Sequence, residues 1–252
     1  MLLRHLTNEL LLRLSLWRRY WLESIAGFAI VLALFAGLLF AVSTFGKLSI
    51  QSGTLDGVVL GFAIWMFAGA AYSSSASEIA EEIRQRTLQQ IAMSPRPLWA
   101  LLLIRATVNI CIGLVILAVM LIGVDIVTGF RLGLSYLQVL ALMTLAAPAL
   151  LGVGLAMAGV LLVVRKVDML QALIYPALVA LVSLPAYPVN ATILLPFAFG
   201  AAAARGAASG QTLQASDYVL ILLNSAAWLG VGLVAFRALD RRARLLGVMG
   251  HV

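Results

Sequence analysis

Residues 106–124 read ATVNICIGLVILAVMLIGV, a run without a single charged side chain. An α-helix needs about 20 predominantly apolar residues to cross a hydrocarbon core ~30 Å thick. Long unbroken apolar runs indicate helices, whereas the strands of a membrane barrel are short and alternate in polarity. Further runs lie at residues 25–45, 57–77, 132–164, 169–204 and 218–236. The sequence therefore predicts an all-α integral membrane protein.

Composition excludes a soluble domain. The chain is 63% hydrophobic and only 11% charged, whereas a soluble protein carries about 25% charged residues. A lone Cys111 provides no disulfide framework, and the two histidines, His5 and His251, stand at the extremities, away from any metal-ligand spacing. No phosphate-binding glycine motif occurs either. We therefore expect no catalytic, metal or cofactor site in this chain.

The distribution of basic residues decides the number of spans, because cytoplasmic loops collect Lys and Arg. With six spans, only Lys47, Arg131 and Arg205 of the 17 basic residues face outward. A seventh span would move the C-terminal arginines outside. Both termini are then cytoplasmic, the expected location is a plasma (bacterial inner) membrane, and the net charge of +7 is an orientation signal rather than a sign of nucleic-acid binding. The expected spans are residues 24–45, 56–77, 98–124, 134–164, 169–185 and 217–236.

The whole chain, residues 1–252, reads as one transmembrane domain with two additional features. Residues 1–21 place Leu and Trp side chains on one helical face, which predicts an amphipathic helix in the inner interface. Prolines interrupt the long run that follows residue 169. Residues 189–204 are therefore expected to form a re-entrant segment on the outer face, before the sixth span.

The linker after the second span is unusually polar. Glu82 and Arg86 are four residues apart, a spacing that favours a helical ion pair. Isoleucine and leucine supply an apolar side, and Ser94 and Pro95 end the segment. This pattern predicts a short amphipathic helix over residues 79–93 on the cytoplasmic face. An ordinary solvated helix without a partner remains the alternative.

Few polar side chains remain inside the predicted spans. Asn109, Gln171 and Asn224 could hydrogen-bond neighbouring helices or line a substrate pathway, and the first role is favoured. Arg105 is expected to extend toward the interface. Small residues fill the fourth span and point to close helix packing, with a substrate groove as the alternative. The ten acidic residues flank the spans, which argues against an ion-driven carrier.

This arrangement resembles the permease subunits of type-2 ATP-binding-cassette exporters. The residues that carry the resemblance are Glu81-Glu82, Arg86-Thr87-Leu88-Gln89 and Ser94-Pro95. The family shows an acidic pair, Gly-Thr-Leu-Glu and Ser-Pro at these places. Arg86 and Gln89 depart from that pattern.

The resemblance implies a coupling helix at residues 79–93, seated on a separate cytoplasmic ATPase subunit that binds ATP and Mg. It also implies a second permease copy, or a homologous permease, and export of an amphipathic or lipid-like substrate by alternating access. The alternatives are a carrier driven by an ion gradient and a structural membrane subunit. The residues expected to contact the ATPase are Glu81, Glu82, Arg84, Arg86, Thr87, Leu88, Gln89, Ile91, Ser94 and Pro95.

Overall fold

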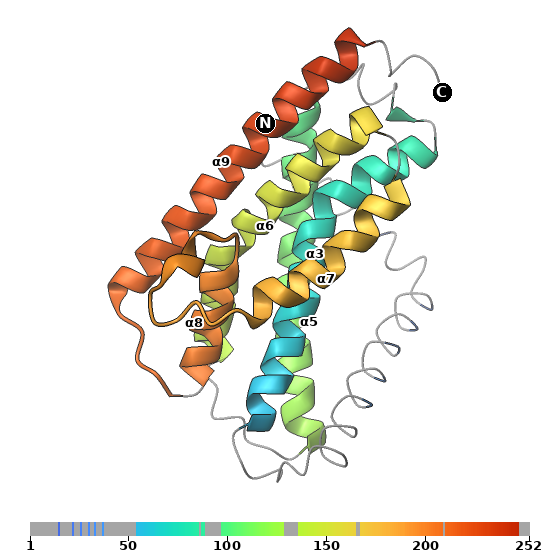
Figure 1. Cartoon of the computed structure of the whole chain (residues 1–252). Helices are drawn as coiled ribbons and strands as arrows, with labels where there is room; N and C mark the ends of the chain where they lie inside the picture. Colours follow the sequence, from blue (N-terminus) through green and yellow to red (C-terminus); the bar gives the residue numbers. More distant parts are fainter. Residues whose placement is uncertain are drawn as a thin grey trace.

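The computed structural model describes residues 54–85, 87–88, 97–128, 136–164, 167–208 and 210–246, together with single positions between 15 and 37. Within these ranges the regular structure is helical throughout (Figure 1). The helices are α3 (Thr54–Arg84), α5 (Leu98–Thr128), α6 (Tyr136–Val164), α7 (Val167–Ser183), the short 3-10 helix η1 (Ala191–Leu194), α8 (Ala198–Ala208) and α9 (Ala215–Leu245).

Four of these helices, α3, α5, α6 and α9, are long and apolar enough to cross a membrane. The prediction of an all-α, multi-pass membrane protein is confirmed at this level. These helices cover the second, third, fourth and sixth predicted spans. Apart from those single positions, the predicted interfacial helix and first span lie outside the residues that the structure describes. Helix α7 covers most of the fifth span, but it is only 17 residues long and contains Pro176.

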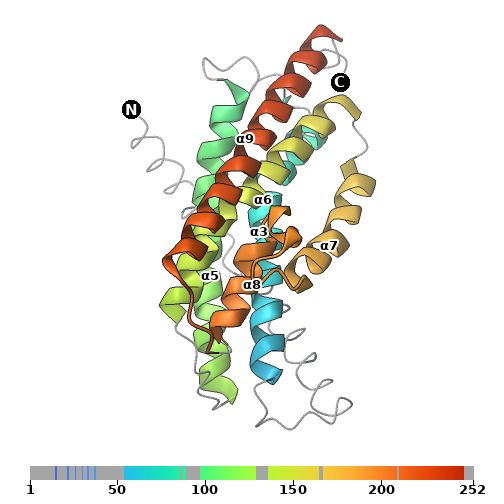
Figure 2. The ribbon, with the colours of Figure 1, turned by 60° about the vertical axis from the view of Figure 1, so that its left-hand side comes forward.

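Helix α6 is the centre of the bundle because its small residues admit other helices closely. Its partners are α9, α3, α8 and α5, and Figure 2 shows α9 lying along it. A Cβ atom on Gly152 would overlap the backbone of Trp228 in α9, and a Cβ atom on Gly232 would overlap the backbone of Gly152 in return. The two glycines therefore form the closest backbone approach between α6 and α9, in the manner of small residues at membrane helix interfaces.

Glycine also brings α3 and α6 together. A Cβ atom on Gly154 would overlap the carbonyl oxygen of Tyr72, so no larger residue fits there without moving α3. In contrast, Gly230 on α9 has open space around its Cα. Close helix packing, the favoured interpretation of the small residues in the fourth span, is therefore what Gly152 and Gly154 provide.

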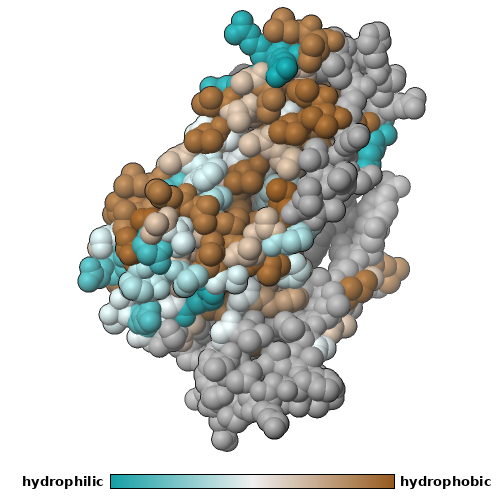
Figure 3. Space-filling model, viewed as in Figure 1, coloured by the Kyte–Doolittle hydropathy of each residue, from teal (hydrophilic) through white to brown (hydrophobic). Residues whose placement is uncertain are grey.

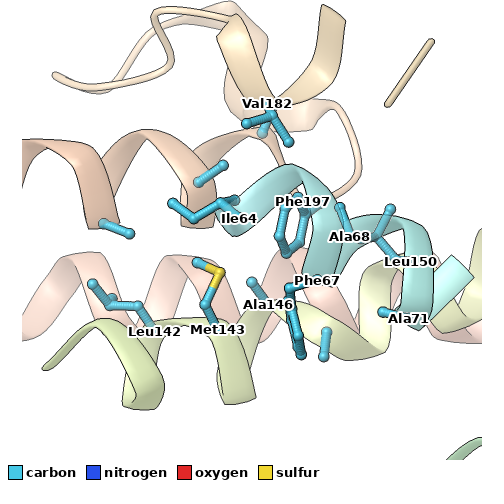
Figure 4. Packing of buried hydrophobic residues seen from close by; sticks show 14 of the residues in the cluster. Ile64, Phe67, Ala68, Ala71, Leu142, Met143, Ala146, Leu150, Val182 and Phe197 are labelled. Carbon is cyan, nitrogen blue, oxygen red and sulfur yellow. The ribbon is translucent and has the colours of Figure 1, made fainter. Parts of the chain in front are cut away.

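Buried side chains form two hydrophobic cores. We call the first the α8-end core; it joins α3, α6, α7 and α8 and includes Ile64, Met143 and Phe197. Figure 4 shows the rings of Phe197 and Phe67 next to one another in this core, with centroids 6.5 Å apart. The second core joins the end of α3, the start of α5 and the ends of α6 and α9, and includes Ile79 and Phe236.

Candidate functional site

The second core lies at what we call the arginine-rich end of the bundle. Helices α3 and α9 end there and α5 begins there, as their contacts show. Arg105 near the start of α5 reaches the last turns of α3, and Arg237 of α9 lies with its guanidinium 4.3 Å from the ring centroid of Trp99 in α5. The described arginines at this end are Arg84, Arg105, Arg237, Arg241, Arg242 and Arg244.

An ion cluster joins α3 to α5 at this end. Glu78 and Glu82 are one helical turn apart on α3, so their carboxylates lie on the same face. Arg105 Nη1 donates to Glu78 Oε2 at 3.0 Å and to Glu82 Oε1 at 3.2 Å. The three side chains are only 17% to 21% exposed. A pair this well shielded interacts more strongly than a surface ion pair, so the cluster ties the two helices together.

The chain turns back against this cluster directly after α3. The Thr87 amide donates to the Glu82 carbonyl at 3.0 Å, and the Thr87 hydroxyl donates to the Glu82 carboxylate. Glu82 is therefore bound by Arg105 and Thr87 from two directions. The predicted Glu82–Arg86 pair involves Arg86, which lies outside the described residues.

Leu88, directly after the turn, lies in the interior of the chain. Only 5% of this residue is exposed, and it packs in the second core with Ile79, Leu98 and Leu102. Burial of a leucine side chain stabilises the folded state by about 1.5–3 kcal/mol, which favours this position in the core. Leu88 is therefore a core residue of this chain, and its contact with an ATPase subunit stays a prediction.

The exposed part of the segment is the edge formed by Glu81, Arg84 and Gln85. The side chains of Glu81 and Arg84 are 54% and 53% exposed and 3.7 Å apart, and the Gln85 amide donates to Glu81 at 2.6 Å. We call these three residues the polar edge. It lies beside Glu82 at the end of α3, and more than half of each of the Glu81 and Arg84 side chains is exposed.

The helix boundary differs from the predicted one. Helix α3 runs without interruption from Thr54 to Arg84, so residues 79–84 belong to the membrane-crossing helix rather than to a separate coupling helix. Residues 87–88 follow the turn. The other expected contacts, Arg86, Gln89, Ile91, Ser94 and Pro95, lie outside the described residues.

The polar residues predicted inside the spans are placed differently from one another. Asn109 is half-buried in α5, about one turn beyond Arg105. The structure describes the backbone of Gln171 in α7 but not its side chain. The Asn224 amide of α9 donates to the Ile193 carbonyl of η1 at 2.6 Å, so Asn224 joins α9 to the segment that precedes α8.

Trp228 makes the same kind of bond one turn further along α9. Its indole N–H donates to the Leu194 carbonyl at 2.8 Å. At the other side of this segment, Arg205 of α8 donates to the Leu184 carbonyl at 2.6 Å. We call this region, where α8 lies and α9 begins, the α8 end of the bundle. Backbone carbonyls outside the long helices are here satisfied by side chains.

A tight reversal connects η1 to α8. Phe197 adopts a positive φ of 69°, a conformation that costs a non-glycine residue free energy and persists only where its surroundings hold it. Its side chain is 1% exposed, which supplies that support. The reversal lets η1 and α8 lie side by side against α9.

Sequence reasoning missed two features of these sites. The partners of Arg105 could have been expected from the one-turn spacing of Glu78 and Glu82, which places two carboxylates on one face at the end of a span. Trp228 gave no such signal, because an indole in the middle of an apolar run is ordinary. No group of three metal-ligating side chains lies among the described residues. Neither a family model nor a curated protein matches the chain.

Proposed function

We propose that this chain is the membrane-spanning subunit of an ATP-driven exporter of the type-2 ATP-binding-cassette class. Two such permeases would move an amphipathic or lipid-like substrate by alternating access, and separate subunits would bind ATP and Mg. The observation that carries the proposal is the polar edge of Glu81, Arg84 and Gln85. It presents charge to a partner at the tip of a membrane-crossing helix.

The ion cluster gives the polar edge a mechanical role. Glu82 lies next to the polar edge, and Arg105 binds it to α5. A partner that pushes on the tip of α3 would therefore move α5 as well. Closure of two ATPase subunits would rock both helices together, which is the motion that alternating access requires.

Charge supports an orientation with the arginine-rich end in the cytoplasm. Among the described arginines only Arg205 lies at the α8 end, and basic residues collect on the cytoplasmic side of a membrane. We propose six spans, with residues 24–45 as the first and α7 as the fifth. Both termini would then lie in the cytoplasm of a cell with a bacterial-type inner membrane.

The α8 end supports a re-entrant segment. Asn224 is about 14 Å along α9 from its first residue, and Trp228 about 20 Å. Both bind carbonyls of η1, so η1 would lie well within the membrane before α8 returns to the surface. Irregular backbone at that depth is tolerated only where protein satisfies its polar groups.

The acidic residues disfavour the alternative of an ion-driven carrier. Such carriers hold a carboxylate in the middle of the membrane. The acidic residues with described side chains, Glu78, Glu81, Glu82, Asp217 and Asp240, all lie in the terminal parts of α3 and α9.

The test is co-purification of the tagged chain from its native membrane, followed by ATPase measurements in lipid nanodiscs. We expect an ATPase subunit to co-purify and its activity to respond to amphipathic substrates. The double variant Glu81→Arg/Arg84→Glu keeps the exposed ion pair but reverses the charges that a partner meets, and it should release the ATPase. Thr212→Glu, at an exposed position of the α8 end, is the control and should retain it. Transport driven by an ion gradient without any ATPase would refute the proposal.

A further inference from the structure

Helix α9 presents one continuous face to its surroundings. It is the least covered of the four long helices. Val219, Leu223 and Val234 are 54%, 60% and 67% exposed, and they lie on one side because their positions differ by close to whole helical turns. Figure 3 shows mainly hydrophobic residues along this helix and hydrophilic residues at its upper tip.

Three arginines continue this face beyond its apolar part. At 100° per residue, Arg237, Arg241 and Arg244 fall on the same side as Leu223 and Val234. Arg241 and Arg242 are exposed. Arg244 Nε donates to both carboxylate oxygens of Asp240 at 3.2 Å, and Arg237 lies against the ring of Trp99. We therefore take Arg241 and the adjacent Arg242, which projects about 100° round the helix from it, as the arginines that a ligand would meet.

The length of α9 sets the depth of these arginines. The apolar part, residues 218–236, spans about 28 Å, which matches the hydrocarbon core. Arg241 and Arg242 then lie about 7–9 Å beyond it, where the phosphates of lipid headgroups are found. An acyl chain along Val234 would thus end in a headgroup at the level of these guanidinium groups.

We propose that the end of α9 binds anionic phospholipids of the cytoplasmic leaflet, with Arg241 and Arg242 on the headgroup phosphate and the exposed Val234 along an acyl chain. Arginine is suited to this role because its planar guanidinium binds phosphate through two hydrogen bonds. The site combines charge with a lipid-facing apolar stripe, so it selects a lipid rather than a soluble anion. It rests on the proposed orientation, with the arginine-rich end in the cytoplasm, but not on the proposed transport.

The test is native mass spectrometry of the detergent-purified chain with equal amounts of phosphatidylglycerol and phosphatidylcholine. We expect preferential retention of phosphatidylglycerol. Each arginine removed should weaken it about fivefold, since a basic residue near an anionic surface contributes about 1 kcal/mol. Arg241→Gln/Arg242→Gln should therefore lose the preference, whereas Arg241→Lys/Arg242→Lys should keep most of it.

Two controls decide whether the lipid binds specifically at the end of α9 or nonspecifically to positive charge. Arg84→Gln removes one charge from the same end of the bundle on another helix, and it should leave phosphatidylglycerol retention unchanged. Inorganic phosphate in large excess should not displace the lipid. The proposal is overturned if Arg84→Gln weakens retention as much as Arg241→Gln, if phosphate displaces the lipid completely, or if the parent chain shows no preference.

Discussion

At the arginine-rich end Arg105 binds the carboxylates of Glu78 and Glu82, whereas at the α8 end Asn224 and Trp228 bind backbone carbonyls of η1. The first end is held by charges between side chains of regular helices. At the second end, the donors to η1 are neutral and bind backbone that has left the regular helix, while the charged Arg205 binds the neighbouring Leu184 carbonyl.

The difference follows from where the backbone is irregular. At the arginine-rich end α3 and α9 are regular almost to their last residues, and backbone amides of the following turns bind carbonyls of their last turns, as Thr87 N–H does with Glu82 and Leu246 N–H with Arg242. The charged side chains there are left to pair with one another. At the α8 end η1 is only four residues long, and most of its backbone groups need partners from elsewhere. Amide and indole donors supply them without the desolvation cost of burying a charge.

The largest effect is expected where α6 and α9 cross between the two cores. Gly232→Ala would place a Cβ atom against the backbone of Gly152, and backbone cannot rotate away as a side chain can. We expect a loss of about 2 kcal/mol or more in stability, and both ends should loosen together. Gly230→Ala, two residues away with open space around it, is the control and should be neutral. Thermal unfolding in detergent measures both, and equal effects would show that the crossing is looser than the structure has it.

The next largest effect on stability is expected at the arginine-rich end. Arg105→Gln leaves two shielded carboxylates facing one another and should cost about 2 kcal/mol, less than the 3–5 kcal/mol of a fully buried pair because the cluster is one-fifth exposed. Adding Glu78→Gln and Glu82→Gln should restore much of the loss. High salt should lower the stability of the parent but not of the triple variant. A single variant as stable as the parent would mean that Arg105 contributes nothing to this end.

The unbroken apolar runs of the sequence predicted α3, α5, α6 and α9, because such a run in a membrane must satisfy its backbone internally and therefore forms a helix. They could not place the end of α3, since Glu78, Glu81 and Glu82 are as compatible with a separate interfacial helix as with a continuation of the span. The contact of Glu82 with Arg105, 23 residues further on, and the burial of Ile79 in the second core favour the continuation. Contacts between residues this far apart in the sequence cannot be predicted from local periodicity.

The same limit applies to the candidate site. Leu88 belongs to the Thr-Leu pair on which the resemblance rests, and a surface contact and a core contact both call for an apolar residue there. The structure places it against Ile79 and Leu98, which come from two different helices. Asn224 was open to two roles for a similar reason, because its partner Ile193 lies in another segment.

A smaller effect is expected at the α8 end. Asn224→Leu and Trp228→Phe each remove one donor from a carbonyl of η1, and each should cost about 1 kcal/mol. The bonds are between neutral groups, so the loss should be independent of salt, in contrast to the loss at Arg105. Thermal unfolding at low and high ionic strength provides the comparison. A salt-dependent loss at Asn224 would contradict the distinction drawn between the two ends.

The smallest effect on stability is expected at the polar edge. Glu81 is half exposed, and its contact with Arg84 at 3.7 Å is a surface ion pair worth about 0–1 kcal/mol. Glu81→Gln should therefore shift the free energy of unfolding by about 0.5 kcal/mol or less, whereas Glu82→Gln, one residue away and bound to Arg105 and Thr87, should cost more.

In the complex with an ATPase subunit the order of the two variants should reverse. Glu81→Gln should then have the larger effect on ATP hydrolysis, because a charge that meets a partner affects association more than folding. We expect Glu81→Gln to reduce substrate-stimulated ATP hydrolysis in nanodiscs while the chain unfolds at the temperature of the parent. If Glu81→Gln leaves hydrolysis unchanged and Glu82→Gln impairs it only in proportion to lost stability, the polar edge is an ordinary solvated surface.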